Sequence, residues 1–472
     1  MNSRTRVKSL PIAFLSLTAA ALLLSGCASS LVGSVGGSSN AATGPAFIVG
    51  TDAPAASVVS FTVPIESVNA IDSSGTTTSL ISGTPSVDFA RFNGLQTLLD
   101  MNDVPEGTYT SISITLGSPT IGYLNEPASG APTIQTEVGT YPASASTYTY
   151  TATLAKPLVV VHAGTPVGLR VDFDLHQSVQ VDGSGNITGQ VTPVFDINTV
   201  GTGDPGGYID TIDAAVVSVD TTAQSFVVQG PHGQQFTINV NGQTNWEGND
   251  SLSSLTTSSI VEVSGTLDKA DQTLDADDVA ILSQNGFYAT GQVTYVQPSS
   301  GPATSFDLYV RGLLPTTTGL TLGQIAQVDL TGNEKYFIYQ WRNPLTQFLF
   351  NESTLLPGQH VAVGGPATGA VNSQAVTVKR IVLRHWGFNG TVVPGSVSTA
   401  NGTFQMQING FVGLLVPQTV TVYIDSPTVF RGGLTGLGSV PASVNVRVVG
   451  LLLKDPTSGK TVLLAHYVDA LN

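Results

Sequence analysis

The chain has 472 residues, of which only 10% are charged, and its formal net charge is −15. Without Arg4, Arg6 and Lys8 near the N-terminus, 14 cations stand against 32 anions, a formal charge of −18. No Lys/Arg cluster follows them, so a polyanion would be repelled and nucleic acid is excluded as a partner. The length favours roughly three to four domains.

The N-terminus has the three parts of an export signal. Its cations precede an apolar run over residues 10–24, and Leu24-Ser25-Gly26-Cys27 follows with small residues at a cleavage position. The run is short for a helix that spans a membrane. Leu-Ser-Gly-Cys resembles the lipobox of bacterial lipoproteins. The alternative is an ordinary secretory signal with an incidental cysteine.

The lipobox resemblance implies that residues 1–26 are a lipoprotein signal peptide and that Cys27 becomes lipid-modified, with acyl chains such as palmitate. Ala28 in place of an aspartate is compatible with lipoprotein sorting to the outer membrane. Buried acyl chains, at ~0.8 kcal/mol per CH₂, would hold the protein on a membrane. We therefore expect a lipid-anchored protein of the cell envelope. Cys27 is the only cysteine, so no disulfide and no cysteine metal ligand is expected.

Residues 27–45 are expected to form a flexible tether, because Ala, Ser, Gly and Asn dominate and cannot bury enough surface to order the chain. Beyond it, apolar residues recur with a period of two, which predicts an all-β protein. The best helical candidate is short, covers residues 91–101 and contains Gly94. The alternating segments include residues 59–65, 109–116, 147–153 and 236–240.

Residues 46–200 are predicted to form one β sandwich. Pro105 and Gly107 set a turn, and Tyr109 opens a strand whose alternate side chains enter a core. A Pro-x-Gly-x-Tyr turn before such a strand resembles transthyretin-like and prealbumin-like sandwich domains.

Further motifs follow in a fixed order along the same residues. They are Thr51-Asp52-Ala53-Pro54, Val87-Asp88-Phe89, Val171-Asp172-Phe173-Asp174-Leu175 and Ser178. Together they resemble the bacterial domain-of-unknown-function family 4382, over roughly 150 residues. The chain departs from it at residues 87–89, where the family tends to have Asp-Leu-Leu, and by an insertion near residues 126–148. The resemblance implies an immunoglobulin-like sandwich and no established activity.

The remainder repeats itself about three times, each copy carrying a Val-rich strand, a glycine, and a later alanine and valine. The residues are Gly265 with Ala276 and Val279, Gly365 with Ala375 and Val378, and Gly450 with Ala465 and Val468. These units resemble domain-of-unknown-function family 5666, small β domains of exported bacterial proteins. We predict small β-barrel-like domains at residues 206–283, 286–384 and 387–472, the middle one divergent and carrying an insertion.

An acidic cluster offers the densest set of hard oxygen ligands, so calcium is one interpretation. The stretch lacks the Asp-x-Asp-x-Asp-Gly pattern, and the alternation of Leu274, Ala276 and Val279 favours a hairpin whose aspartates face water. We therefore predict no metal site, and the cluster stays a weak calcium candidate. Its members are Asp268, Asp271, Asp275, Asp277 and Asp278.

Aromatic residues crowd into the middle repeat, over residues 336–350. Exposed aromatics on a β strand can stack on sugars, whereas buried ones fill a core. Tyr339 and Trp341 share one face of the predicted strand and are the weak ligand-binding candidates. Core packing is the interpretation we favour.

We find no catalytic constellation in the sequence. The histidines are scattered singly and no Gly-x-Ser-x-Gly elbow is present. Asp172 and Asp174 share a strand face, yet a structural role, such as capping a turn, fits them better. Ser458-Gly459-Lys460-Thr461 lacks the first glycine of a phosphate loop and is expected to be a hairpin turn.

These features predict a non-catalytic, lipid-anchored envelope protein with a structural, adhesive or assembly role and no cofactor. A lipoprotein that binds glycans or cell-wall fragments is the alternative, and a hydrolase without a recognisable motif comes third. The expected partners are the membrane, through the anchor, and an envelope protein or a glycan.

Overall fold

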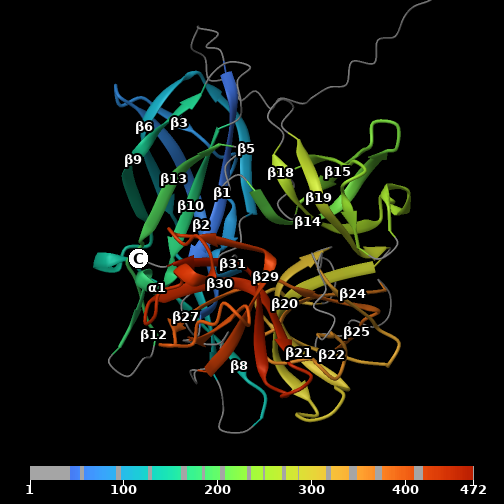
Figure 1. The fold of residues 1–472 in the computed structure, drawn as a ribbon. Coiled ribbons are helices and arrows are strands. Elements are labelled where there is room, and N and C mark those ends of the chain that lie inside the picture. Colours follow the sequence, from blue (N-terminus) through green and yellow to red (C-terminus); the bar gives the residue numbers. More distant parts are fainter. Residues whose placement is uncertain are drawn as a thin grey trace, which may run out of the picture. The chain divides into compact units, whose positions relative to one another are not determined.

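The computed structural model describes residues 43–470, apart from gaps at 54–57, 92–96, 126–129, 161–166, 183–186, 202–207, 231–234, 248–249, 268–272, 285, 315–319, 340–347, 367–374 and 409–417. Strands dominate this part of the chain, and its one α-helix is the single turn α1 (Leu175–Ser178) (Figure 1). The predicted all-β class is therefore confirmed. Within the described ranges, no helix is long and apolar enough to cross a membrane.

Two sheets at the N-terminal end of the described chain share one apolar core and form a sandwich. The ring of Phe173 lies 5.1 Å from the rings of Phe61 and Phe89, between centroids, and 4.6 Å from that of Phe195. Phe89 and Phe173 belong to two of the sequence motifs, so those motifs supply core residues.

The seven-stranded sheet has the order β8-β7-β2-β6-β9, and β3 and β4 also pair with β2. Its strands are β2 (Val58–Asp72), β3 (Thr77–Ser79), β4 (Ser86–Asp88), β6 (Gly107–Leu116), β7 (Thr120–Asn125), β8 (Thr133–Val138) and β9 (Tyr148–Val160). The four-stranded sheet has the order β13-β10-β1-β5. Its strands are β1 (Thr43–Ala53), β5 (Thr97–Pro105), β10 (Val167–Asp174) and β13 (Phe195–Gly201). The hairpin β11 (Val179–Val181) and β12 (Ile187–Val191) and the 3₁₀ turns η1 (Phe89–Arg91) and η2 (Pro142–Ser144) complete this part.

The Pro-x-Gly-x-Tyr segment makes the expected turn between β5 and β6. Tyr109 is 4% exposed, and its hydroxyl donates to the carbonyl oxygen of Pro105 at 2.9 Å. The ring thus enters the core while its polar end returns to the turn, as in the tyrosine corners of other sandwiches.

Two expectations fail at the edges of the sandwich. The helical candidate, residues 91–101, is wrong from Thr97 onward, where β5 begins and pairs with β1. The predicted tether, residues 27–45, also runs too far, because β1 begins at Thr43. In both cases pairing between strands outweighs the local preference of the sequence.

The first barrel closes because β16 pairs with β19 as well as with β15, within the order β16-β15-β14-β18-β19-β17. Its strands surround an apolar core of their own. They are β14 (Tyr208–Asp220), β15 (Ser225–Gln229), β16 (Gln235–Asn239), β17 (Asn245–Trp246), β18 (Ser259–Leu267) and β19 (Leu274–Gln284), with the 3₁₀ turn η4 (Leu252–Ser254).

The middle barrel has the order β23-β26-β24-β20-β21-β22-β25. β25 and β26 follow one another along the chain and together correspond to β19 of the first barrel, because β25 pairs with β22 and β26 pairs with β24. The strands are β20 (Gly286–Gln297), β21 (Ser305–Leu314), β22 (Ile325–Asp329), β23 (Lys335–Ile338), β24 (His360–Pro366), β25 (Ala375–Thr377) and β26 (Arg380–Arg384).

The last barrel is closed in the order β27-β28-β29-β31-β30. Its strands are β27 (Trp386–Val392), β28 (Thr403–Ile408), β29 (Gln418–Arg431), β30 (Asn445–Lys454) and β31 (Thr461–Ala470), with the 3₁₀ turn η5 (Leu437–Ser439). Residues 458–461 lie at the turn between β30 and β31, as predicted. The described chain is therefore a sandwich followed by three small barrel-like β domains, of which the last is a fully closed barrel.

The three barrels share one pairing scheme, in which the valine two residues before the repeat glycine pairs with an apolar residue of the next strand. In the middle barrel that partner is Ile381, so the assignment of Ala375 and Val378 to the repeat is wrong by three residues. The reason is that this copy splits the strand into β25 and β26, which changes the spacing. The pairs are Val263 with Val279, Val363 with Ile381 and Val448 with Val468.

Two of the repeat glycines lie where their strands shift register and the backbones come close. A Cβ atom on Gly265 would lie 2.1 Å from the carbonyl oxygen of Asp275, and one on Gly450 would lie 2.1 Å from that of Leu464. Glycine therefore recurs there because each bulge has no room for a side chain.

Candidate functional site

Three consecutive side chains connect the middle barrel to the last. Arg384 ends β26, His385 follows it, and Trp386 begins β27. All three are buried, although arginine is almost never buried unless it is paired. The segment Arg384-His385-Trp386 is called the junction below.

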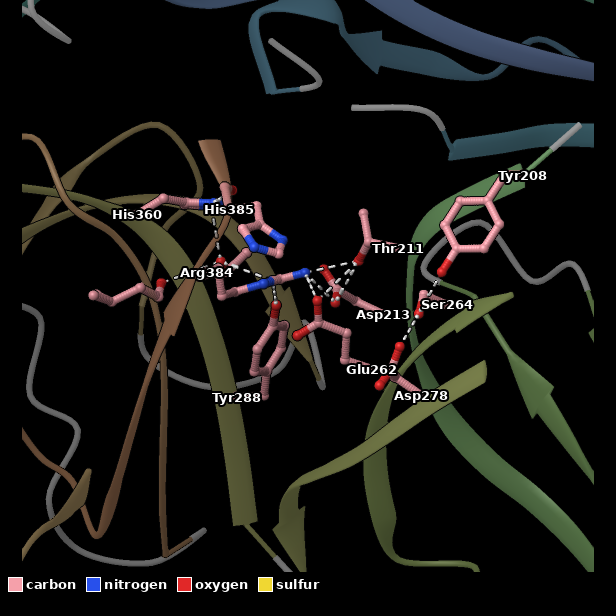
Figure 2. A network of polar contacts seen from close by, with 12 residues as sticks. Tyr208, Thr211, Asp213, Glu262, Ser264, Asp278, Tyr288, His360, Arg384 and His385 are labelled. Carbon is pink, nitrogen blue, oxygen red and sulfur yellow. Dashed lines mark hydrogen bonds and ion pairs between the residues drawn. The ribbon is translucent and has the colours of Figure 1, made fainter. Parts of the chain in front are cut away.

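Arg384 extends from the middle barrel to the first barrel (Figure 2). Its Nη2 donates to Oγ1 of Thr211 at 2.7 Å and to Oδ1 of Asp213 at 3.3 Å. The same nitrogen forms an ion pair with Oε1 of Glu262. Thr211 and Asp213 lie on β14 and Glu262 lies on β18, so one guanidinium contacts two strands of the first barrel.

The second nitrogen of the guanidinium is held by side chains of β20 in the middle barrel. Nη1 of Arg384 donates to the hydroxyl of Tyr288 at 2.7 Å and to Oγ1 of Thr290 at 3.1 Å. Oγ1 of Thr290 also lies 3.1 Å from Nε2 of His360. The guanidinium therefore bridges the two barrels through one nitrogen on each side.

The polar contacts of the junction are withdrawn from water. The side chains of Arg384, Asp213 and Glu262 are 4%, 3% and 1% exposed. One guanidinium faces two carboxyl groups, so ionising both leaves an excess negative charge. Burial raises the pKa of Glu262 to about 8; Arg384 opposes the rise and Asp213 adds to it. Glu262 is therefore expected to hold a proton at neutral pH.

His385 contacts the last barrel. Its ring stacks on that of His466, on β31, with centroids 4.6 Å apart and an interplanar angle of 6°. Burial lowers the pKa of His385 well below its usual value, and His466 and Arg384 lower it further. The stacked ring of His385 is therefore neutral in the folded protein at neutral pH.

Trp386 contacts two polar side chains of the middle barrel. The guanidinium carbon of Arg311 lies 4.8 Å from the indole centroid, and the ring of His360 lies 4.4 Å from it. Arg311 also donates through Nε to Gln292. Contacts of this kind hold an aromatic ring by its face as well as by burial. The three junction residues thus join three barrels.

A second polar chain runs through the first barrel near the junction (Figure 2). The hydroxyl of Tyr208 donates to Oγ of Ser264 at 3.3 Å. The hydroxyl of Ser264 in turn donates to Oδ2 of Asp278 at 3.3 Å. Nδ2 of Asn245 donates to the same carboxylate at 2.8 Å. Asp278 is thus held by side chains of its own barrel.

The three calcium candidates on β19 differ in their exposure to solvent. Asp275 is exposed and accepts from Nδ2 of Asn239 at 3.1 Å, Asp277 is half-buried, and Asp278 is buried in the polar chain above. Asp268 and Asp271 lie outside the described residues. Across the described ranges, no group of three or more His, Cys, Asp or Glu side chains could hold a metal ion.

Of the two aromatic ligand-binding candidates, only Tyr339 lies among the described residues. Tyr339 is 4% exposed and packs with Tyr288 and Val382 in an apolar cluster, and burial raises its pKa well above the usual value. Phe348 and Phe350 are also buried. Trp341, the other candidate, lies outside the described residues, so the sugar-stacking interpretation stays a prediction for it.

The remaining sequence predictions concern the lipidation site Cys27 and the strand residue Asp174. Cys27 and the predicted signal peptide lie outside the described residues. Asp174 accepts the backbone N–H of Gln177 at 2.9 Å and caps α1, which confirms a structural role for this aspartate.

Sequence reasoning missed the junction because its members are far apart in the chain. His360, His385 and His466 each stand alone in the sequence, yet His385 contacts both of the others, one through its carbonyl oxygen and one through its ring. The available signal was the run Arg384-His385-Trp386 itself, three chemically distinctive residues at the boundary between two predicted domains.

The fold and its junction define a multidomain all-β protein, in which a sandwich precedes three barrels that are linked through buried polar contacts. Residues 48–189 match the family model described as "Domain of unknown function (DUF4382)". Residues 207–280 match the one described as "Domain of unknown function (DUF5666)". Both resemblances drawn from the sequence motifs are therefore confirmed.

Comparison with the curated proteins gives no match. Among solved structures, the Bacillus anthracis TIE protein aligns over 93% of this chain and 76% of its own, with 9% identity. The TM-score of that alignment is 0.09, so it carries no argument about fold or function.

Proposed function

We propose that this protein is a non-catalytic lipoprotein of the cell envelope, anchored through Cys27, that presents its sandwich and barrels as one stiff unit. Its role would be structural, adhesive or in assembly, and the outer membrane is the proposed location. The anchor is supported by the lipobox-like Leu24-Ser25-Gly26-Cys27 behind an export signal.

The observation that favours a stiff unit is the Arg384 bridge. Taking a guanidinium and two carboxyl groups out of water costs free energy, and such a pair adds little net stability compared with apolar packing. Buried polar groups of this kind can instead fix one geometry among several. A bridge between two separate cores fits a protein whose barrels must keep a set orientation.

The anchor is tested by Cys27→Ser in a bacterial host, with Ser30→Ala as the control. Acyl transfer needs a thiol, so the variant should lose palmitate labelling and accumulate as an uncut precursor. The control should be labelled and should partition with membranes like the wild type. Labelling of the Cys27→Ser chain would remove the basis of the lipoprotein assignment.

The location and role are tested on the same strains. Fractionation should recover the labelled protein with the outer membrane, and protease treatment of whole cells reports which side it faces. A glycan array and a pull-down with the purified chain then compare the two kinds of partner. Saturable binding to a glycan would favour the glycan-binding alternative over the structural role.

A further inference from the structure

The carboxyl group of Glu262 has an asymmetric environment. Its Oε1 pairs with Arg384 and is 3.4 Å from Oγ1 of Thr211, which donates to it. Its Oε2 is buried and has no hydrogen-bond partner among the described residues. An ionised carboxylate places charge on both oxygens, so Oε2 would carry buried charge that no donor stabilises. A proton on Oε2 removes that charge.

We propose that the Arg384 bridge is a proton-coupled latch, in which the first and middle barrels hold each other tightly when the Glu262–Asp213 pair has taken up one proton and more weakly when both carboxyls are ionised. The proposal goes beyond the function above and does not depend on the lipid anchor.

The charge count supports the latch. With Glu262 protonated, the guanidinium of Arg384 faces one carboxylate, Asp213, and the bridge is neutral. With both carboxyls ionised, the same space holds one excess negative charge, which burial penalises. The rise in the pKa of Glu262, caused first by burial, agrees with this geometry.

Other titratable groups face the bridge from the surrounding strands. Tyr288 on β20 accepts a hydrogen bond from Nη1 of Arg384. Tyr339 keeps its proton near neutral pH because burial raises its pKa. Glu247 acts on Glu262 as a further negative charge and is paired with Arg380 at 2.9 Å. Burial raises the pKa of Glu247 and Arg380 opposes the rise, whereas the pKa of Glu262 rises to about 8, so Glu262 is the member expected to titrate near that pH.

Histidines and Asp278 complete the surroundings. His360 on β24 contacts Thr290, beside the guanidinium, and His385 is adjacent to Arg384 in the chain. The lowered pKa of His385 keeps it neutral near neutral pH. His466, on β31 of the last barrel, stacks on His385. Asp278 accepts hydrogen bonds from Asn245 and Ser264.

The direction of the pH effect follows from linkage. When the latch opens, Glu262 reaches water and regains a pKa of about 4.3. Between that value and the closed-state pKa of about 8, closing takes up a proton. The closing equilibrium should therefore weaken by up to about tenfold for each pH unit of increase in this interval and level off above it.

Hydrogen–deuterium exchange of the full chain tests this, with the isosteric variant Glu262→Gln as reference. The variant cannot take up the proton, so the ratio of wild-type to variant exchange rates cancels the pH dependence of exchange itself. In peptides from β14, β18 and β26 the ratio should rise by at least about tenfold from about pH 5.5 to about pH 8.5. In peptides from β2 and β6 it should stay constant. A constant ratio at the bridge would overturn the latch.

Asp307→Asn is the matched control, because burial also raises the pKa of Asp307, on β21, away from the bridge contacts. It should retain the wild-type pH dependence at β14 and β18. Infrared spectra of the wild-type chain give a second readout that needs no variant to fold. The carbonyl stretch of a buried protonated carboxyl should be present at about pH 6 and lost at about pH 9.5. Its absence at the lower pH would also overturn the proposal.

Discussion

His385 and His466 stack in the folded protein with their ring centroids 4.6 Å apart and their planes 6° from parallel. One ring belongs to the junction and the other to β31, so the stack joins the end of the middle barrel to the last strand of the last barrel. His385 is buried and lies next to Arg384 in sequence. A proton on its ring would therefore place a second positive charge beside Arg384 in a buried site.

The stack predicts a loss of stability in acid. The folded-state pKa of His385 is lowered, so between the unfolded value of about 6.5 and the folded value the unfolded chain binds more protons. Stability from this group is present above about pH 6.5 and is lost as pH falls below it. Melting of His385→Gln and of the wild type at about pH 7.5 and about pH 5.5 checks this. Between these pH values the melting temperature of the wild type should fall more than that of His385→Gln. Equal falls would contradict the predicted role of His385.

Arg384→Met should destabilise the protein strongly. The change leaves Glu262 and Asp213 facing each other without the guanidinium, and removing one partner of a buried ion pair costs about 3–5 kcal/mol. Arg170→Met is the control, because its pair with Asp196 lies at 3.5 Å with side chains 31% and 67% exposed. That change should cost about 0–1 kcal/mol. Denaturant unfolding measures both, and similar costs would show that the bridge does not stabilise the fold.

Gly265→Ala should also destabilise the fold, by about 1–3 kcal/mol, because its Cβ would meet the backbone oxygen of Asp275 at 2.1 Å. A backbone atom cannot move aside as a flexible side chain can. Gly242→Ala provides the comparison, since a Cβ there would meet nothing within 4 Å. Thermal melting should separate the two variants clearly. An unchanged melting temperature for Gly265→Ala would mean that the bulge can relax.

The sequence was sufficient for features that depend on neighbours along the chain. Alternation located strands such as β2 and β6, and the repeated glycines marked the bulges at Gly265 and Gly450. It was not sufficient where contacts cross between barrels: Arg384 and Glu262 are 122 residues apart. Nor could it place Ile381, because the interruption between β25 and β26 changes the spacing without leaving a pattern. Long-range polar pairing has no periodicity, and only the folded chain brings its members together.

Substitutions at Tyr339 and Trp341 separate core packing from sugar binding in the aromatic stretch. Tyr339 is 4% exposed, so Tyr339→Ala should cost about 3–5 kcal/mol through lost burial and a cavity, whatever ligand the protein meets. Trp341→Ala decides between the interpretations. If Trp341 is core, its removal should cost a similar amount and no sugar should alter its fluorescence. If it is a stacking platform, melting should stay unchanged while saturable glycan binding is lost, each stacked ring being worth ~1–3 kcal/mol by analogy with bases. We expect the core outcome, and unchanged melting with lost binding would replace the structural role by glycan binding.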